Sequence, residues 1–185
     1  MNTRILIDMD NTIGDLLTPW CEMLNERHGT SVLPDDIREW DMRVAFPSLS
    51  GNQIYAPLKE PELWDRMRPF PLAQHYVRRL RDDGYHVLIL TSANRYSASI
   101  KLTHFLFKHF PFLSDRDVII ARQKDLIDGD VIVDDAPHNL KRDRKLKILM
   151  SAGHNAGFDE KSVGAVRATN WEQIYKIIKD RSDLT

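Results

Sequence analysis

Short runs of aliphatic residues, each bounded by polar turns, recur along the chain. They occupy residues 5–7, 87–90, 118–120, 131–133 and 148–150. Because neighbouring positions in each run are all apolar, the pattern predicts strands that are covered on both faces, as in a parallel sheet.

Helical spacing of apolar residues separates several of these runs. One predicted helix ends near Gly84 and presents Leu72, Tyr76, Val77 and Leu80 on one face, and a second apolar stripe covers residues 100–107. A last helix is expected to begin at Asn170, capped together with Gln173, and to bury Trp171, Ile174, Ile177 and Ile178. Alternating strands and helices predict a doubly wound, mostly parallel, Rossmann-like α/β fold.

Residues 16–71 interrupt this alternation. They contain helical pieces and proline-rich turns but no run that resembles a buried strand. We expect a small helical cap inserted after the first strand, with residues 1–15 and 72–185 forming the core domain. Long functional insertions of this kind commonly form lids.

Composition and charge narrow the possible partners. The 185 residues carry 26 basic and 27 acidic side chains, a net charge of −1, so no overall field favours a nucleic acid polymer or an anionic membrane. No stretch approaches the roughly 20 apolar residues of a spanning helix, and we expect a cytoplasmic protein without a membrane partner. The single cysteine, Cys21, excludes an internal disulfide and is expected to fill space in the core. The sequence leaves the oligomeric state open, and a homodimer is one option beside a monomer.

Polar side chains follow four of the predicted strands at the point where each strand ends. They are Asp8 and Asp10, then Thr91 and Ser92, then Arg122 and Lys124, and finally Asp134 and Asp135. Ligands bind at the carboxyl ends of the strands in open parallel sheets, so these side chains are expected to converge. Gathered carboxylates repel unless a cation neutralises them, and ligand oxygens without Cys or His select a hard ion such as Mg²⁺.

Each motif also has a purely structural interpretation. A carboxylate at a strand end often caps the next helix, and paired aspartates often occupy solvated turns. Lys101 competes with Lys124 as the lysine of the site, and Arg122 fits a surface cation equally well. We expect His154 and Asn155 to be structural residues. The combination of the motifs in this order favours the chemical interpretation.

The motifs resemble those of the haloacid dehalogenase-like phosphohydrolase superfamily. The resemblance rests on Asp8-Met9-Asp10-Asn11-Thr12, on Thr91 after an aliphatic strand, on Lys124, and on the acidic pair after residues 131–133. The stretches ARQKDLIDGDVIVDD, KILMSAGHNAG and ATNWEQIYKIIK are similar to those of the 5'(3')-deoxyribonucleotidase family. The likeness covers most of the core and fades across residues 29–61.

The resemblance implies a role for each residue. Asp8 would attack phosphorus to form an aspartyl-phosphate, and Asp10 would serve as general acid and then general base. The metal would be held by Asp8, the backbone carbonyl of Asp10 and the pair Asp134 and Asp135, of which Asp135 is slightly favoured. Thr91, Lys124, Ser92 and Arg122 would stabilise the phosphoryl group.

The insertion is where the resemblance places recognition of the base. The available aromatic residues are Trp40, Phe46, Tyr55 and Trp64, although each also fits the interior of a cap. Leu16 stands where the family usually has a phenylalanine, and Asn11 replaces the usual glycine. These departures leave the base preference open.

The sequence therefore predicts a Mg²⁺-dependent phosphomonoesterase, a 5'-nucleotidase acting on deoxyribonucleoside monophosphates. One alternative keeps the chemistry and changes the substrate to a small sugar or metabolite phosphate. A second is a non-enzymatic phospho-acceptor module, which is disfavoured because the middle strand ends at Thr91 rather than at an aspartate.

Overall fold

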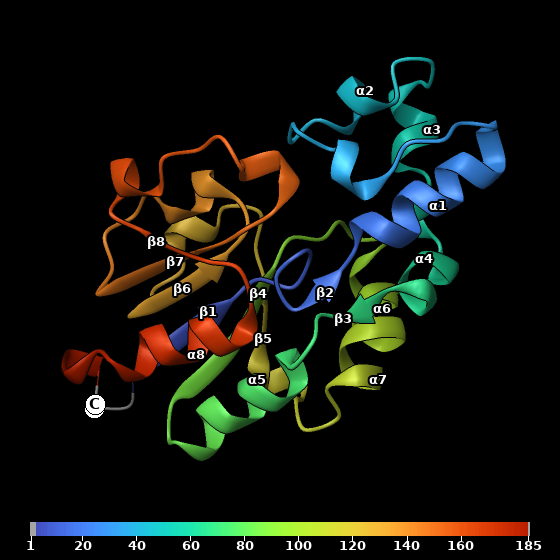
Figure 1. Ribbon diagram of the computed structural model, residues 1–185. Coiled ribbons are helices and arrows are strands. Elements are labelled where there is room, and N and C mark those ends of the chain that lie inside the picture. Colours follow the sequence, from blue (N-terminus) through green and yellow to red (C-terminus); the bar gives the residue numbers. More distant parts are fainter. Residues whose placement is uncertain (1–2, 185) are drawn as a thin grey trace.

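The computed structural model describes residues 3–184. A six-stranded parallel sheet forms the centre of the molecule, with helices packed around it (Figure 1). Its strand order is β5-β4-β1-β6-β7-β8, and every neighbouring pair runs parallel. The strands are β1 (Arg4–Ile7), β4 (His86–Thr91), β5 (Val118–Ile120), β6 (Val131–Asp134), β7 (Leu146–Met150) and β8 (Val166–Ala168). The five predicted strands and the doubly wound α/β class are confirmed.

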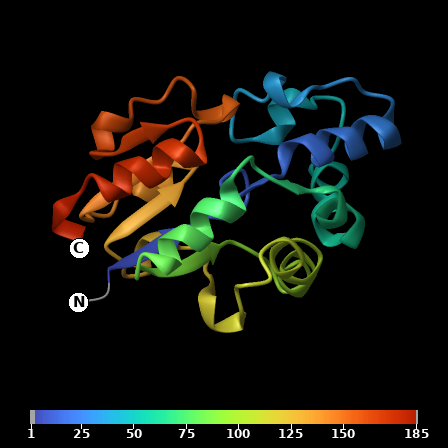
Figure 2. The same cartoon turned by 60° about the horizontal axis from the view of Figure 1, so that its bottom comes forward.

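Successive side chains of the central strands enter two different cores, as the two-residue period of a strand requires. Ile5 and Ile7 of β1 face helices α5 (Ala73–Asp82) and α8 (Trp171–Lys179), which lie side by side on one face of the sheet (Figure 2). Leu6 faces the opposite side, where short 3₁₀ turns at residues 137–140 and 160–163 supply Leu140 and other apolar cover. Both faces of the sheet are therefore buried.

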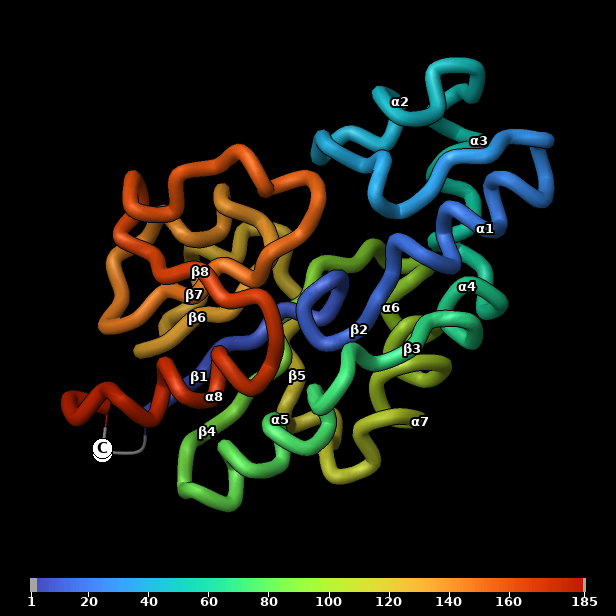
Figure 3. The backbone as a smooth tube through the Cα atoms, in the orientation of Figure 1, coloured from blue at the N-terminus to red at the C-terminus, as the bar shows by residue number. Residues whose placement is uncertain are grey.

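Residues 16–71 leave the sheet after β1 and return before α5 (Figure 3). They contain the helices α1 (Leu17–His28), α2 (Met42–Ala45), α3 (Gly51–Tyr55) and α4 (Pro61–Arg66). At the neck, the two-residue strands β2 (Gly14–Asp15) and β3 (Arg68–Pro69) pair antiparallel. We call residues 16–71 the insertion; its designation as a separate cap domain stays a prediction.

The helix after β4 changes its hydrogen-bonding pattern part way along. It begins as α6 (Ala98–Lys101), continues as a π-helix over Leu102–Leu106 and ends as α7 (Phe107–His109). Phe105 and Leu106 are fully buried and Lys101 is 2% exposed. π-Helical turns are rare and often mark functional sites.

Several local predictions need correction. Leu72 does not belong to a helix face: it precedes α5 with φ 64° and is 57% exposed. Asn170 caps α8 by accepting from the Gln173 amide, but Gln173 Oε1 accepts from the amide and hydroxyl of Thr169 rather than from Asn170. Ile177 is only partly buried. The short strand β8 (Val166–Ala168) had too little hydrophobic signal to be predicted.

Cys21 lies in the interior of α1 and is 1% exposed, as expected of a core residue. Burial raises the pKa of its thiol to about 12, so the thiolate is strongly disfavoured. Among residues 3–184, no helix combines the length and apolar character that crossing a bilayer demands.

Candidate active site

The turn after β1 presents Asp8 and Asp10 at the carboxyl edge of the sheet. The Asp8 amide donates to the Val133 carbonyl at 2.9 Å, which continues the β1–β6 ladder up to the carboxylate. Asn11 then adopts φ 54°, a left-handed conformation that Asn tolerates better than most residues. Its Oδ1 accepts the amides of Leu16 and Leu17 at the start of α1. Asn11 can therefore stand where the family usually has glycine.

Three buried carboxylates meet at this edge. Asp8, Asp134 and Asp135 each offer an oxygen, and these oxygens lie within 4.8 Å of one another. The residues are 5%, 0% and 1% exposed, so water contributes little to solvating their charge. An all-oxygen set of this size fits a hard metal ion. The carboxylate of Asp10 does not belong to this group.

Lys124 supplies a positive charge to the cluster. Its Nζ lies 2.5 Å from Asp8 Oδ1 and donates to Asp134 Oδ2 at 2.8 Å. With all groups ionised, three carboxylates and one ammonium leave two negative charges, which a divalent cation would neutralise.

The two members of the acidic pair have different surroundings. Asp134 accepts from Lys124, from the Ala136 amide at 2.9 Å and from Asn139 Nδ2 at 3.0 and 3.1 Å. Both buried oxygens of Asp135 lack a hydrogen bond of normal geometry among the described residues, although His154 Nε2 lies 3.1 Å from Oδ2. Hydrogen bonds therefore occupy Asp134 and leave Asp135 available to a cation.

The pKa values reflect this crowding. Burial raises the pKa of Asp8 well above its usual range; Lys124 opposes this effect, and the neighbouring carboxylates reinforce it. Burial likewise raises the pKa of Asp135, and His154 offsets part of that shift. Burial alone would lower the pKa of Lys124, but Asp8 and Asp134 outweigh it and the pKa is raised. A bound cation would favour the ionised carboxylates.

A second buried lysine, Lys101, is hydrogen-bonded to Asp10. Lys101 Nζ donates to Asp10 Oδ2 at 2.7 Å, to Thr91 Oγ1 at 2.8 Å and to the Ser92 carbonyl at 3.0 Å, and it lies 5.0 Å from the Trp64 ring centre. Asp10 Oδ1 is buried and has no hydrogen-bond partner among residues 3–184. Lys101 thus holds one carboxylate oxygen of Asp10, and the other oxygen is not engaged by this lysine.

A cavity of about 410 Å³ opens over these groups, a size within the range of small-molecule sites. Its polar floor includes Asp8, Asp10, Ser92, Lys101, Arg122, Lys124 and Asp135. Its apolar wall comes from the insertion and consists of Leu16, Leu17, Trp20, Ile37, Trp40, Met42, Tyr55, Leu58 and Trp64.

The predicted residues occupy different places around this cavity. Ser92 and Arg122 reach the lining, as do Leu16, Trp40 and Tyr55 of the insertion. Thr91 is fully buried and meets Lys101, and Phe46 is 1% exposed; neither belongs to the lining.

Sequence reasoning missed three contributions. The sequence pattern presents Lys101 and Lys124 as alternatives, whereas the structure places both lysines in the site. His154 was expected to be merely structural, yet it lies beside Asp135. Trp20 also lines the cavity, and its four-residue spacing from Leu16 at the start of the helix that follows the turn is the signal in the sequence that could have identified it.

The sheet topology and the acidic edge together define a hydrolase of the haloacid dehalogenase-like class. Comparison with family models then gives a match over residues 2–183 to "5' nucleotidase, deoxy (Pyrimidine), cytosolic type C protein", and the chain belongs to this family. It is accordingly a phosphoric monoester hydrolase of the nucleotidase type, and the phospho-acceptor alternative is set aside.

Curated relatives match over nearly their whole length. The chain is 29% identical to a 5'(3')-deoxyribonucleotidase of Clostridium acetobutylicum over 177 residues, covering 96% of this chain and 95% of the relative. It is also 29% identical to a 5'(3')-deoxyribonucleotidase of Bacillus subtilis over 175 residues, covering 94% and 97%.

Solved structures share the fold. A haloacid dehalogenase-like hydrolase of Streptococcus pneumoniae superposes with a TM-score of 0.66 at 16% identity, covering 95% of this chain and 98% of that one. A hydrolase of this class from Deinococcus radiodurans, solved with bound phosphate and sodium, gives a TM-score of 0.61 at 14% identity, covering 97% and 96%.

Proposed function

We propose that this protein is a Mg²⁺-dependent 5'-nucleotidase that removes phosphate from deoxyribonucleoside monophosphates in the cytoplasm. The observation that carries the proposal is the convergence of Asp8, Asp10, Lys124 and Asp135 beneath one cavity. The deoxyribonucleotidases among its relatives support the substrate class.

In the proposed reaction, a carboxylate oxygen of Asp8 attacks phosphorus and the bond to the leaving oxygen breaks. Asp10, protonated on its free Oδ1, gives that proton to the leaving oxygen. Asp10 then takes a proton from water as the water oxygen attacks the aspartyl-phosphate. Cleavage of the bond between Asp8 and phosphorus releases phosphate, restores the Asp8 carboxylate and leaves Asp10 protonated as at the start.

We assign the metal to Asp8 and Asp135, together with the backbone carbonyl of Asp10. When bound, Mg²⁺ would stabilise negative charge on the phosphoryl oxygens. Asp134, already held by three kinds of donor, anchors Lys124 so that its ammonium stays beside Asp8. Lys124, Arg122 and Ser92 then offer positive charge and a hydroxyl to the phosphoryl group.

The insertion side of the cavity suits a flat heterocycle. Trp20 and Tyr55 lie with ring centres 5.7 Å apart, and Leu16 lines the same wall. Aromatic and apolar surface binds the base by stacking and by excluding water. Leu16 supplies part of this apolar wall without the flat ring of a phenylalanine.

Release of inorganic phosphate tests the proposal. We expect dUMP, dTMP or dGMP to be hydrolysed with Mg²⁺ and not with EDTA. Asp8→Asn should lower kcat by on the order of 10³-fold or more, because the nucleophile is lost. Asp128→Asn, which removes a carboxylate that is 79% exposed, is the matched control and should retain activity.

A panel of sugar and metabolite phosphates distinguishes the alternative substrate class. Preference for one of these over every deoxyribonucleotide by more than about tenfold in kcat/KM, or about 1.4 kcal/mol, would replace the nucleotide assignment. The absence of metal-dependent release from any phosphate would contradict the proposed chemistry itself.

A further inference from the structure

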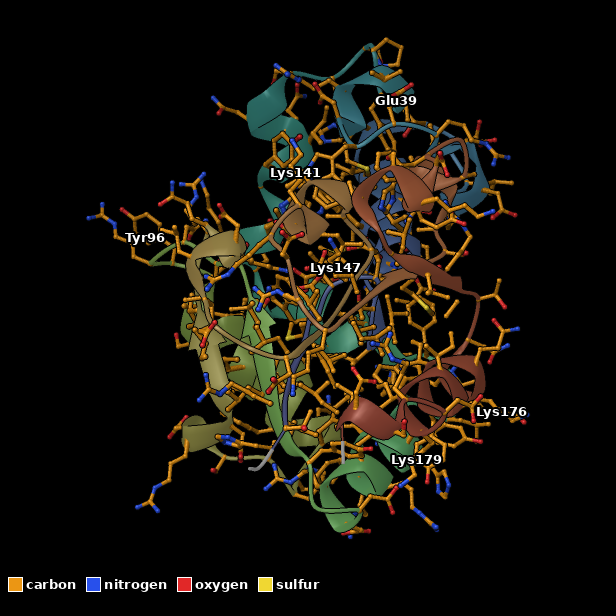
Figure 4. The ribbon with its side chains drawn as sticks, turned by 90° about the vertical axis from the view of Figure 1, so that its left-hand side faces the viewer. Glu39, Tyr96, Lys141, Lys147, Lys176 and Lys179 are labelled. Atoms are coloured by element: carbon orange, nitrogen blue, oxygen red, sulfur yellow. The ribbon has the colours of Figure 1, made fainter. Side chains whose placement is uncertain are left out.

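An aromatic cluster joins the insertion to the core beside the metal-binding carboxylates. Trp40 comes from the insertion, is 57% exposed and meets two imidazoles of the core edge-on. Its ring centre lies 5.1 Å from that of His138 and 5.0 Å from that of His154, with interplanar angles of 84° and 81°. Glu39, next to Trp40, and Lys141 of the core lie at the same end of the molecule (Figure 4).

His154 connects this cluster to Asp135. Its side chain is 4% exposed and its Nε2 lies 3.1 Å from Asp135 Oδ2. The same nitrogen has no hydrogen bond of normal geometry among the described residues, but its distance from Asp135 Oδ2 lies within the range of N–H···O hydrogen bonds. The imidazole therefore has Trp40 against it and Asp135 at its nitrogen.

The turn that carries His154 is fixed to the strand end that carries Asp135. Asn155 Nδ2 donates to the Asp135 carbonyl at 2.7 Å and to the Met150 carbonyl at 2.8 Å. Asn155 is 2% exposed, so these bonds are shielded from water. The distance between His154 and Asp135 is thus set by the core, whereas Trp40 restricts the orientation of the imidazole ring.

The insertion touches the same turn through its backbone. A methyl group built on Gly153 would lie 2.6 Å from the carbonyl oxygen of Ile37, three residues before Trp40. Only a residue without a side chain lets the two backbones approach this closely. The contact provides a way to separate the insertion from the turn without changing His154 or Trp40.

We propose that His154 is a positioning residue for Asp135 and that Trp40 holds its imidazole in place, so that metal affinity depends on docking of the insertion. The idea rests on the assignment of Asp135 as a metal ligand. A proton on Nε2 donated to Oδ2 directs Oδ1 toward the cation, as hydrogen bonds to ligating groups do at metal sites. If docking of the insertion strengthens metal binding, metal binding must strengthen docking of the insertion by the same factor.

Isothermal titration of the metal-free full chain with MgCl₂, in the absence of substrate, tests the proposal. We expect His154→Asn to weaken Mg²⁺ binding by about 10- to 100-fold, as loss of a residue that orients a ligand does. Trp40→Ala and Gly153→Ala should each weaken it by about fivefold or more through loss of docking. Leu33→Ala is the control and should bind within about twofold of wild type, since the Leu33 side chain belongs to the insertion but is 61% exposed.

A second measurement separates positioning from damage to the fold. With saturating Mg²⁺, kcat of His154→Asn should recover to within a few-fold of wild type, which a misfolded variant would not show. Wild-type affinity in His154→Asn overturns the positioning role. Wild-type affinity in both Trp40→Ala and Gly153→Ala overturns the link to the insertion. Failure of the wild type to bind Mg²⁺ instead overturns the assignment of the metal site.

Discussion

At the scale of single residues, the site depends on two lysines with separate partners. Lys124 lies beside Asp8, and Lys101 donates to Asp10. Because each carboxylate has its own lysine, the two can differ in role. The proposed reaction needs Asp8 as an ionised nucleophile and Asp10 beside it as a carboxylic acid. Each lysine reaches its carboxylate from a different segment, Lys101 from α6 and Lys124 from the turn after β5.

Replacing Lys101 tests its role in holding Asp10. Lys101→Met removes three hydrogen bonds to Asp10, Thr91 and Ser92. We expect kcat for a deoxyribonucleotide to fall by on the order of 10²-fold, the lower part of the range for general acid–base catalysis. Hydrolysis of p-nitrophenyl phosphate should fall much less, because its leaving group needs little protonation.

Lys108→Met is the matched control, since Lys108 lies on the same helix, is 49% exposed and pairs with Asp65 away from the site. Equal losses on both substrates in Lys101→Met would contradict a role through Asp10. Such a result would indicate that Lys101 acts on the phosphoryl group.

At the scale of elements, α8 supports the turn that carries Asp8 and Asp10, the proposed catalytic pair. Trp171 at its start is fully buried and donates through Nε1 to the Thr12 carbonyl at 2.9 Å. The contact joins residues 159 positions apart in the sequence. Correct placement of the start of α8 therefore matters to the Asp8–Thr12 turn.

The cap of α8 gives a stability prediction. Asn170 Oδ1 accepts the Gln173 amide at 3.0 Å, and Asn170→Ala leaves that donor without its partner. We expect the free energy of unfolding to fall by about 1 kcal/mol, measured by urea denaturation. Asn170→Asp keeps the acceptor and should stay close to wild type. A fall of the same size in both variants would show that the cap bond is not the cause.

At the scale of the whole molecule, convergence of strand ends places three carboxylates in one buried cluster. Folding without metal then brings together like charges that are well solvated in the unfolded chain. The raised pKa of Asp135 reflects that cost, because burial favours its neutral form. Metal binding and global stability are therefore linked.

Asp135→Asn should be more stable than wild type in EDTA at neutral pH and should gain nothing from Mg²⁺. Folding raises the pKa of this carboxyl, so its contribution to the free energy of unfolding is fully present below the unfolded pKa of about 3.9. That contribution is lost as the pH rises through the pKa of the folded state. The advantage of the variant should thus grow from acid to neutral pH. For wild type, Mg²⁺ at about 100 times Kd should add about 2.7 kcal/mol.

Thermal unfolding followed by circular dichroism, with EDTA and with Mg²⁺ across this pH range, measures both effects. Asp143→Asn changes the same charge on a fully exposed side chain and serves as the control. A variant Asp135→Asn that keeps the wild-type gain from Mg²⁺ would exclude Asp135 as a ligand.

Local patterns along the chain were enough to predict five of the six strands and the acidic edge of the sheet. Aliphatic runs that are apolar at every position must be covered on both faces, and the polar residues after parallel strands emerge at the same edge. Asp8, Lys124 and Asp135 could therefore be brought together from strand ends alone.

Which groups meet away from those strand ends could be seen only in the folded molecule. Lys101 reaches Asp10 from a helix, and Trp40 reaches His154 from the insertion. No local rule of spacing relates these pairs, because their distances depend on how helices and loops pack over the sheet. The different surroundings of Asp134 and Asp135 also depend on this packing, since adjacent identical residues differ only in the donors around them.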